Sequence, residues 1–299
     1  MKYRVRVPAS SANLGPGFDA LGLALDINLV CTFQVAASLR IRAEGRDASD
    51  IPEDESNLIW QTAQQIARAA GRMLPQIDLL VSNDIPIGKG LGSSAAALTA
   101  GVVVANQVLD LGWTRYEVLQ QAARIEGHPD NVAACVLGAV VATSMEPDGK
   151  THAVRVELPA NYGVAAVVPE FMLSTTKARA VLPNSYTRKD AVFNVQHSAL
   201  LIAALCTGST DSFSAALQDR MHQPYRAALI PGFDEMMAIR EPGLLGCALS
   251  GAGPSVLVFY ESGARCVTKA FERAFAKHGN NAITYFPEIQ RTGYVLEAV

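Results

Sequence analysis

Apolar and polar positions along the N-terminal part of the chain predict strands and one amphipathic helix. Alternation over residues 2–7 and the apolar character of residues 21–35 predict strands, the second as a long or broken hairpin arm. Residues 42–55 are charged and predict a loop, whereas residues 77–81 predict a short strand. A helix is expected over residues 57–71, opened by Asn57, ended by Gly71 and burying Ile59, Ala63, Ile66, Ala67 and Ala70.

Two further helices are predicted before the middle of the chain. Residues 91–109 carry no charge and are therefore weighed as a membrane span, but their polar and glycine positions favour a closely packed core helix. The second helix covers residues 115–126 and ends at the glycine and proline of residues 127–129. Its expected inward residues are Tyr116, Leu119, Ala122, Ala123 and Ile125. Residues 136–143 predict a strand interrupted by glycine, and residues 146–149 a turn.

The C-terminal half mixes strand and helix patterns without regular alternation. The expected strands are 162–168, 246–250, 255–260, 283–286 and 294–296, and the expected helices are 193–205, 211–221, 233–239 and 262–279. The 193–205 helix is apolar all round and is predicted to be buried. Ser262 is expected to cap the last helix, whose inward face is Val267, Ala270, Phe271, Ala274 and Phe275. Hairpin-like strands mixed with helices indicate an α+β fold, with domains 1–155 and 156–299.

Composition narrows the class of protein. The chain has 299 residues, 49% of them hydrophobic, which suggests two domains with sizeable cores. A net charge of −3 argues against nucleic acid or an acidic membrane surface as a partner. The five cysteines are scattered without a C-x-x-C pair, and residues 1–8 lack a signal-peptide apolar core, so a reduced cytoplasmic setting is expected. Five scattered histidines without H-E-x-x-H argue against a zinc site.

The strongest candidate for chemistry is the glycine-rich stretch 85–97, in which Gly88, Gly90 and Gly92 alternate ahead of two serines and a helix. Glycines let several N–H groups converge on an anion, and a helix N-terminus adds further donors and a positive dipole end. We therefore predict a polyphosphate cradle. The stretch matches neither the Walker A nor the Rossmann glycine pattern. The alternative is a tight strand-to-helix turn that binds no ligand.

Two other loops carry small and polar residues. Residues 8–22 hold two prolines, three glycines, and the short polar side chains Asn13 and Asp19. This pattern fits a turn between strands as well as it fits the wall of a site. Residues 250–255 form a glycine turn between two predicted strands. It could be a plain turn, although we expect it to back the phosphate and substrate pocket.

Taken together, these loops resemble the GHMP kinase superfamily and, within it, the homoserine kinase family. The resemblance rests on Pro-Ala-Ser-Ser-Ala-Asn-Leu-Gly-Pro-Gly-Phe-Asp at residues 8–19, and on Pro-x-Gly-x-Gly-Leu-Gly-Ser-Ser-Ala at residues 86–95. It also rests on Glu-Gly-His-Pro-Asp-Asn at residues 126–131 and Ser-Gly-Ala-Gly-Pro-Ser at residues 250–255. The glycine loop indicates only the superfamily; the first and third motifs point to the family. Length and motif order fit over essentially the whole chain.

The resemblance implies an N-terminal domain like the second domain of ribosomal protein S5 and a ferredoxin-like C-terminal domain, with ATP and substrate between them. It implies transfer of the γ-phosphoryl group of ATP to the hydroxyl of L-homoserine in threonine biosynthesis, and a homodimer. The implied phosphate-binding residues are Pro86, Ile87, Gly88, Lys89, Gly90, Leu91, Gly92, Ser93, Ser94, Ala95 and Ala96, with Asn57 near the adenine. The implied Mg²⁺ ligands are Ser94 and Glu126, and the implied substrate-binding residues are Asn13, Asp19, Asn131, Arg179 and Arg226.

The chemistry of homoserine suits these residue types. A carboxylate such as Asp19 can pair with an ammonium, and arginines can fork onto a carboxylate. Mg²⁺ needs few protein ligands, because it keeps waters and phosphate oxygens. Asp130 is the candidate base, although a loose transition state makes a strong base dispensable. Lys89 could place a charge near the phosphates or be a solvated loop lysine.

Several of these residues could instead have ordinary structural or surface roles. Glu126 could be a solvated helix end, Asp130 and Asn131 turn formers, and Arg179 and Arg226 surface arginines. His128 is expected to hold its turn rather than to act in catalysis. Residues 174–179 are polar and could form a loop that caps the site.

Two other functions compete with phosphorylation of homoserine. One is a GHMP kinase for another small alcohol, and the other is a silent sensor of a nucleotide or metabolite. A silent sensor has no need of the pair Ser94 and Glu126, so their presence argues against it.

Overall fold

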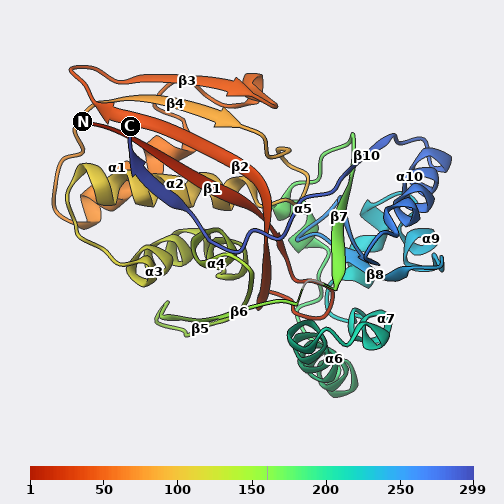
Figure 1. The fold of residues 1–299 in the computed structure, drawn as a ribbon. Helices are drawn as coiled ribbons and strands as arrows, with labels where there is room; N and C mark the ends of the chain where they lie inside the picture. Colours follow the sequence, from red (N-terminus) through yellow and green to blue (C-terminus); the bar gives the residue numbers. More distant parts are fainter. Residues whose placement is uncertain (160) are drawn as a thin grey trace.

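The computed structural model describes residues 1–159 and 161–299, whose strands form two sheets. The first sheet has the order β11-β1-β2-β4-β3, with β5 added beside β2 and β6 beside β5 (Figure 1). Its strands are β1 (Lys2–Ala12), β2 (Leu21–Val35), β3 (Arg40–Gly45), β4 (Ile77–Asn83), β5 (Val140–Met145), β6 (Thr151–Val156) and β11 (Val295–Ala298). The second sheet has the order β10-β7-β9-β8, formed by β7 (Tyr162–Pro169), β8 (Leu244–Leu249), β9 (Val256–Glu261) and β10 (Ala282–Tyr285). The predicted two-domain α+β fold is confirmed.

Four helices cover one face of the first sheet (Figure 1). They are α1 (Leu58–Ala69), α2 (Ser93–Val108), α3 (Arg115–Glu126) and α4 (Asp130–Leu137). The predicted span of α3 is confirmed. Helices α1 and α2 lie within their predicted ranges and are shorter by one or two residues at each end. Helix α2 is almost wholly buried, and Gly101 lets it approach α1 closely, since a Cβ there would lie 2.7 Å from the carbonyl oxygen of Ile59.

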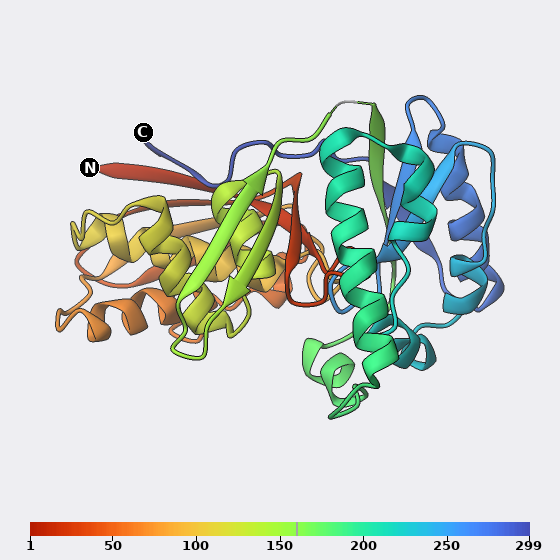
Figure 2. The same cartoon turned by 90° about the horizontal axis from the view of Figure 1, so that it is seen from below.

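Helices lie on both faces of the second sheet (Figure 2). They are α5 (Thr175–Ala180), α6 (Arg188–Thr207), α7 (Phe213–Ala216), α8 (Gln223–Arg226), α9 (Phe233–Met237) and α10 (Thr268–Lys277). Alternate residues of β9 point to opposite faces: Phe259 packs toward α6 and α7, whereas Val258 and Tyr260 pack toward α9 and α10.

Four local predictions are wrong. Strand β3 extends into the predicted loop 42–55 as far as Gly45, because one buried residue, Ile41, is enough to hold a charged edge strand parallel to β4. Helix α4 replaces the first part of the predicted strand 136–143, because the helix begins directly after Pro129. Tyr116, expected inside, is 53% exposed and donates its hydroxyl hydrogen to the carbonyl of Ala153. Ser262 does not cap α10, which follows a short 3₁₀ turn at Arg265–Val267.

Helix α6 also differs from the prediction of a buried helix. Its exposed apolar side chains are Val192, Val195 and Leu200, and its buried residues are Asn194, Leu201, Ala204 and Leu205. It covers one face of the second sheet, so its outer side faces away from the fold (Figure 2). By length and composition α6 could cross a membrane. In this fold it is tied to the N-terminal loop, where Asn194 and Ser198 both donate to the carbonyl oxygen of Pro16.

The two sheets are joined by the chain between β6 and β7, and the C-terminus returns to the first sheet. Strand β11 pairs antiparallel with β1, so the two termini lie side by side (Figure 1). This strand belongs to the sheet of the N-terminal domain, although the predicted C-terminal domain 156–299 included it. The division near residue 155 otherwise stays a prediction.

Candidate active site

The three loops singled out in the sequence meet in one cavity between the two sheets. The loop before α2 forms one wall, and the end of α3 and the start of α4 form a second. The loop after β1, α5, α8 and the 250–255 turn also line the cavity. The lining residues with predicted roles are Asn13, Asp19, Pro86, Gly88, Lys89, Gly90, Leu91, Gly92, Ser93, Ser94, Ala95, Glu126, Asp130, Asn131, Arg179 and Arg226. Ile87, Ala96 and Asn57 lie outside this lining.

The glycine loop has the backbone that an anion cradle requires. Gly88, Gly90 and Gly92 have φ of 69°, 81° and 69°, in the left-handed region. Gly92 is also the N-cap of α2, and since it has no side chain it supplies no capping oxygen to the first turn. The free N–H groups of a 16-residue helix therefore face the loop, where a phosphate group could accept from them.

Serine hydroxyls and backbone groups bind the three loops to one another. Ser10 N–H donates to Leu91 O (3.1 Å), and Ser250 Oγ donates to Gly90 O (2.6 Å). Ser250 Oγ also lies 2.9 Å from Ser11 Oγ, so β1 and the 250–255 turn are joined across the domains. These contacts fix the glycine loop relative to the substrate side of the cavity.

We expect Gly90→Ala to disable the glycine loop, whereas Gly112→Ala should not. Both glycines have positive φ, so both alanines cost about 1 kcal/mol in backbone strain. Only at Gly90 would the new Cβ lie 2.3 Å from Ser250 O and 2.7 Å from Gly253 O; nothing lies within 4 Å at Gly112. The measurement is the KM for ATP together with thermal denaturation. Equal kinetics in the two variants would contradict the expectation.

Asp19 and Arg179, predicted to bind opposite ends of an amino acid, bind each other in this structure. Arg179 Nη2 and Nη1 lie 2.6 and 3.1 Å from the two carboxylate oxygens of Asp19. Burial lowers the pKa of Arg179, but the hydrogen bond and charge of Asp19 outweigh it and the net shift is upward. Both side chains are more than a third exposed, so separating them costs little.

Asn13 is buried and its amide is committed within the fold. Its Nδ2 donates to Gly251 O (2.9 Å) and its Oδ1 accepts from the N–H of Asp19 (3.0 Å). It therefore fixes the loop that carries Asp19 against the 250–255 turn.

Arg226 is the most deeply buried charge in the cavity, with 1% of its surface exposed. Its Nε donates to Ala178 O (3.1 Å), and its Nη1 donates to Gly251 O (3.1 Å) and to His222 Nδ1 (2.9 Å). Within residues 1–159 and 161–299 no carboxylate lies within ion-pair distance of it. Burial, and then the charge of Arg179, lower the pKa of Arg226. A buried cation that lines a cavity without an acid partner in the described chain is a candidate anion site.

Glu126, His128 and Asp130 form an acidic corner on the opposite wall. Burial raises the pKa of Glu126, whose carboxylate lies 3.9 Å from His128 Nε2. His128 Nδ1 lies 3.2 Å from Asp130 Oδ1, which also accepts from Asn131 N–H at 2.7 Å. Burial lowers the pKa of His128, but its contacts with Asp130 and Glu126 give a net rise. His128 thus contacts both acids, in accord with the role of holding its turn.

Two predicted ATP-binding residues, Asn57 and Lys89, make hydrogen bonds within the fold. Asn57 caps α1: its Oδ1 accepts from Ile59 and Trp60 N–H, and its Nδ2 donates to Pro52 O. Its side chain thereby shapes a wall of the fold, and its Nδ2 keeps a second hydrogen beyond the one that bonds to Pro52 O. Lys89 Nζ donates to the carbonyls of Glu170 and Phe171, which connects the glycine loop to the second domain. It is therefore not a freely solvated lysine, because its ammonium group is bound to two backbone carbonyls.

Sequence reasoning missed two features. One is an apolar cavity beside the glycine loop, lined by Leu29, Ile51, Pro52, Leu58, Val81 and Ala97 and sharing Gly88, Ser93 and Ser94 with the main cavity. Its residues come from separate segments and carry no local signal. The other is a buried network around Asp219 and His222, which lies directly before the Gln-Pro-Tyr-Arg stretch that the sequence did single out.

Comparisons with known proteins agree with the geometry. Family models described as GHMP kinases N terminal domain and GHMP kinases C terminal match residues 57–139 and 201–277. The homoserine kinase of Solibacter usitatus is 57% identical over 98% of this chain and 97% of its own length, and that of Deinococcus radiodurans is 45% identical over 87% and 84%. The crystal structure of homoserine kinase from Cytophaga hutchinsonii superimposes with a TM-score of 0.86 at 28% identity, covering 99% of this chain and 97% of that one. Galactokinase of Lactococcus lactis shares the fold, with a TM-score of 0.69 at 16% identity over 98% and 95%.

Proposed function

Because the chain belongs to the homoserine kinase family of the GHMP kinases, we propose that it phosphorylates L-homoserine. The γ-phosphoryl group of ATP passes to the hydroxyl of homoserine, giving O-phospho-L-homoserine and ADP, a step of threonine biosynthesis. The P–O bond to the β-phosphate breaks, a P–O bond to the homoserine oxygen forms, and the hydroxyl proton is released.

One observation supports the substrate class independently of the family assignment. Arg226 is a buried cation without an acid partner in the described chain, and it lines the same cavity as the glycine loop. A ligand carboxylate would supply the missing charge and accept a forked pair of hydrogen bonds. This arrangement favours an acceptor alcohol that carries a carboxylate, as homoserine does.

Asp19 and Arg179 would complete the recognition of the amino acid. We propose that the ammonium of homoserine contacts Asp19 and that its carboxylate lies between Arg179 and Arg226. Their ion pair is exposed enough to open at small cost, and an amino acid offers each partner a replacement of opposite charge. Asn13 would position Asp19, and Asn131 would face the hydroxyl end.

ATP would bind with its phosphates on residues 86–96 and its adenine in the apolar cavity beside them. That cavity shares Gly88, Ser93 and Ser94 with the main cavity, so one nucleotide could occupy both. Asn57 would act there as the cap that fixes the cavity wall.

The residues present fit a magnesium ion held jointly with ATP. Glu126 is a largely buried carboxylate without a lysine or arginine partner among the described residues, and Ser94 lines the same cavity. The described chain has no group of three His, Cys, Asp or Glu side chains that could hold a metal alone, so the ion would need phosphate oxygens. Bound Mg²⁺ would supply neutralisation of charge on the phosphates.

The protein's own contribution would be alignment and charge. Phosphoryl transfer passes through a loose transition state, so positioning and electrostatics outweigh proton abstraction. Asp130 is the proposed base, although its Oδ1 already accepts a hydrogen bond from Asn131 N–H. Lys89 would hold the glycine loop against the second domain through its bonds to the carbonyls of residues 170 and 171.

The test is Mg²⁺-dependent ADP release by purified protein with and without L-homoserine. Strong stimulation by homoserine is expected, with O-phosphohomoserine identified as the product. ATP binding without stimulation would overturn the assignment. Turnover with a different small alcohol would favour another GHMP kinase activity, and no turnover with any would favour a sensor.

We further propose a cytoplasmic homodimer. The five cysteines of the described chain are free, which suits a reducing compartment. The outer side of α6 exposes Val192, Val195 and Leu200, and residues 191–207 carry no Asp, Glu, Lys or Arg. Two copies of one apolar face can pair about a twofold axis. Light scattering would measure the mass directly, and a monomer would contradict the proposal.

A further inference from the structure

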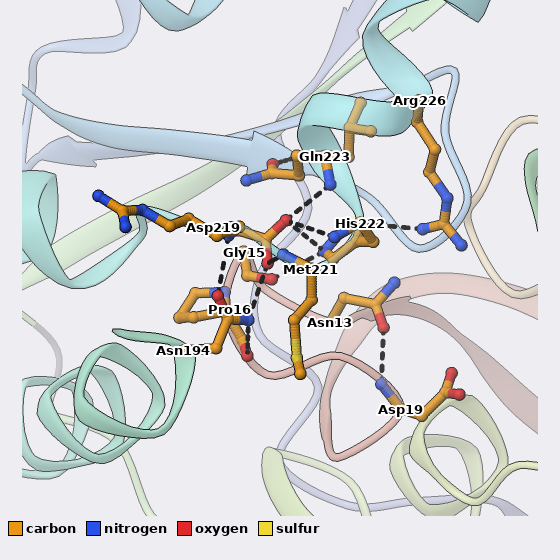
Figure 3. Close-up of polar contacts among 12 residues, drawn as sticks. Asn13, Gly15, Pro16, Asp19, Asn194, Asp219, Met221, His222, Gln223 and Arg226 are labelled. Carbon is orange, nitrogen blue, oxygen red and sulfur yellow. Dashed lines mark hydrogen bonds and ion pairs between the residues drawn. The ribbon is translucent and has the colours of Figure 1, made fainter. Parts of the chain in front are cut away.

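Behind Arg226 lies a buried polar network that the phosphorylation mechanism does not by itself require (Figure 3). The side chains of Asp219 and His222 are fully buried. His222 Nε2 lies 2.8 Å from Gly15 O, and His222 Nδ1 lies 2.9 Å from Arg226 Nη1. The imidazole therefore stands between the N-terminal loop and the guanidinium that lines the cavity.

These two contacts fix the protonation state of His222. A carbonyl oxygen only accepts hydrogen bonds, so Nε2 must carry a hydrogen to donate to Gly15. A guanidinium only donates, so Nδ1 must be unprotonated to accept from Arg226. The ring is thus the neutral Nε2–H form. Burial, only partly offset by the charge of Asp219, favours the same form by lowering the pKa of His222.

Asp219 holds the backbone that presents His222. Its Oδ2 accepts from the N–H groups of His222 (2.9 Å) and Gln223 (2.6 Å), and its Oδ1 accepts from Met221 N–H and Asn194 Nδ2, both at 2.8 Å (Figure 3). Asp219 Oδ2 lies 3.6 Å from His222 Nε2, too far for a hydrogen bond. The carboxylate therefore orders the turn into α8 and does not take the ring proton.

Phe18 packs on the same group. Its ring stacks on the imidazole of His222, with centroids 5.3 Å apart and planes inclined by 22°. The guanidinium carbons of Arg226 and Arg179 lie 5.5 and 5.6 Å from its centroid. The ring thus limits rotation of both the imidazole and the two arginines.

We propose that His222 is a positioning residue that orients the guanidinium of Arg226 toward the carboxylate of the substrate, with Asp219 fixing the turn that presents His222. This inference rests on the proposed function, because the carboxylate is that of homoserine. It adds a residue pair that holds the arginine without touching the substrate.

The neutrality of the acceptor is the reason a histidine suits this place. An aspartate or glutamate would also accept from Arg226, but it would neutralise the guanidinium and compete with the ligand. Neutral imidazole fixes the direction of one N–H group and leaves the positive charge for the ligand's carboxylate. The described chain gives no hydrogen-bond partner for Nη2 of Arg226, which keeps that nitrogen available.

Two amide substitutions separate this role from a general structural one. In His222→Asn the amide lies where Nδ1 was, so it can still accept from Arg226 but loses the bond to Gly15. In His222→Gln the amide reaches the Nε2 position, so it keeps the bond to Gly15 and loses the one to Arg226. Each variant gives up one buried hydrogen bond, so similar losses of thermal stability are expected.

The kinetics should differ between them. His222→Gln is expected to raise the KM for L-homoserine roughly 10- to 100-fold, and His222→Asn by about threefold or less. The KM for ATP should stay unchanged in both. The inhibition constant of 3-aminopropan-1-ol, which is homoserine without its carboxylate, should be the same in His222→Gln and the parent. The proposal would be overturned if both variants raised the KM for L-homoserine equally. It would also be overturned if His222→Gln weakened binding of 3-aminopropan-1-ol as much as it weakened binding of homoserine.

A measurement on the unaltered protein does not depend on how the variants fold. Nitrogen NMR of ¹⁵N-histidine-labelled protein with homoserine bound reports the tautomer of each ring. A neutral Nε2–H ring for His222 is expected, and a hydrogen on Nδ1 would overturn the proposal. Absence of homoserine-dependent turnover in the parent protein would refute the proposed function. The tautomer of His222 would then be measured in the free protein, so the two failures can be told apart.

Discussion

Arg226→Leu is expected to raise the KM for L-homoserine by about two to three orders of magnitude, because truncating one partner of a buried, hydrogen-bonded charge pair costs roughly 2–5 kcal/mol. Arg226 is buried and has no acid partner in the described chain, so the substrate's carboxylate would be its only counter-charge. The KM for ATP should change little, since the glycine loop is held by other contacts.

The matched control is Arg220→Leu. Arg220 is the same residue type six positions earlier, but its side chain is 39% exposed and pairs with Asp190 outside the main cavity. Arg226→Lys keeps the charge without the forked geometry and should fall between the parent and Arg226→Leu. Steady-state kinetics with homoserine varied at saturating ATP measures all three. If Arg226→Leu weakens ATP and homoserine equally, Arg226 has a structural role and not the proposed one.

Glu126→Gln is expected to lower kcat by roughly 10²- to 10³-fold, the usual cost of removing one electrostatic stabiliser of a transition state. The amide is nearly isosteric, so the change removes the negative charge that would hold Mg²⁺ while the packing at the end of α3 stays. Raising the Mg²⁺ concentration should recover part of the activity. The control is Glu117→Gln on the same helix: Glu117 forms a capping box with Thr114, and glutamine supports that box too.

Glu126→Gln should also stabilise the ligand-free protein at neutral pH. Burial raises the folded-state pKa of Glu126 above its ordinary value of 4.5, so the folded protein binds the proton more tightly than the unfolded chain does. The carboxylate then costs stability at pH values above the folded pKa, and the cost disappears below about pH 4.5. Chemical denaturation at pH 7.5 and near pH 4 should show the gain only at the higher pH. A loss of stability at pH 7.5 would indicate that Glu126 is a structural residue.

The position of the phosphate loop was predictable because its evidence is local. Alternating glycines followed by serines and a small-residue helix specify positive φ and a helix N-terminus within a few residues. The same holds for α3, whose capping box at Thr114 and closing glycine at Gly127 are adjacent to the helix they bound. The family resemblance extended these local signals to residues such as Glu126 and Arg226.

Other features could not be predicted because they depend on neighbours far away in sequence. Helix α6 has an apolar sequence on all sides, and only the tertiary fold shows that its outer side is uncovered. Asn57 was expected to open its helix and does, but only the fold brings Leu29, Pro52 and Val81 from separate segments into the apolar cavity beside it. Strand β3 needed β4 beside it to become a strand.

The sequence by itself therefore determined the two-domain α+β fold, the backbone of the glycine loop and the family, since short-range patterns carry them. The tertiary structure alone decided how the charges pair. It placed Arg179 against Asp19, left Arg226 without an acid partner among the described residues, and set the ring of His222 behind it. The physical reason is that burial and pairing are properties of three-dimensional neighbours: His222 is 207 residues from Gly15, the carbonyl that fixes its tautomer.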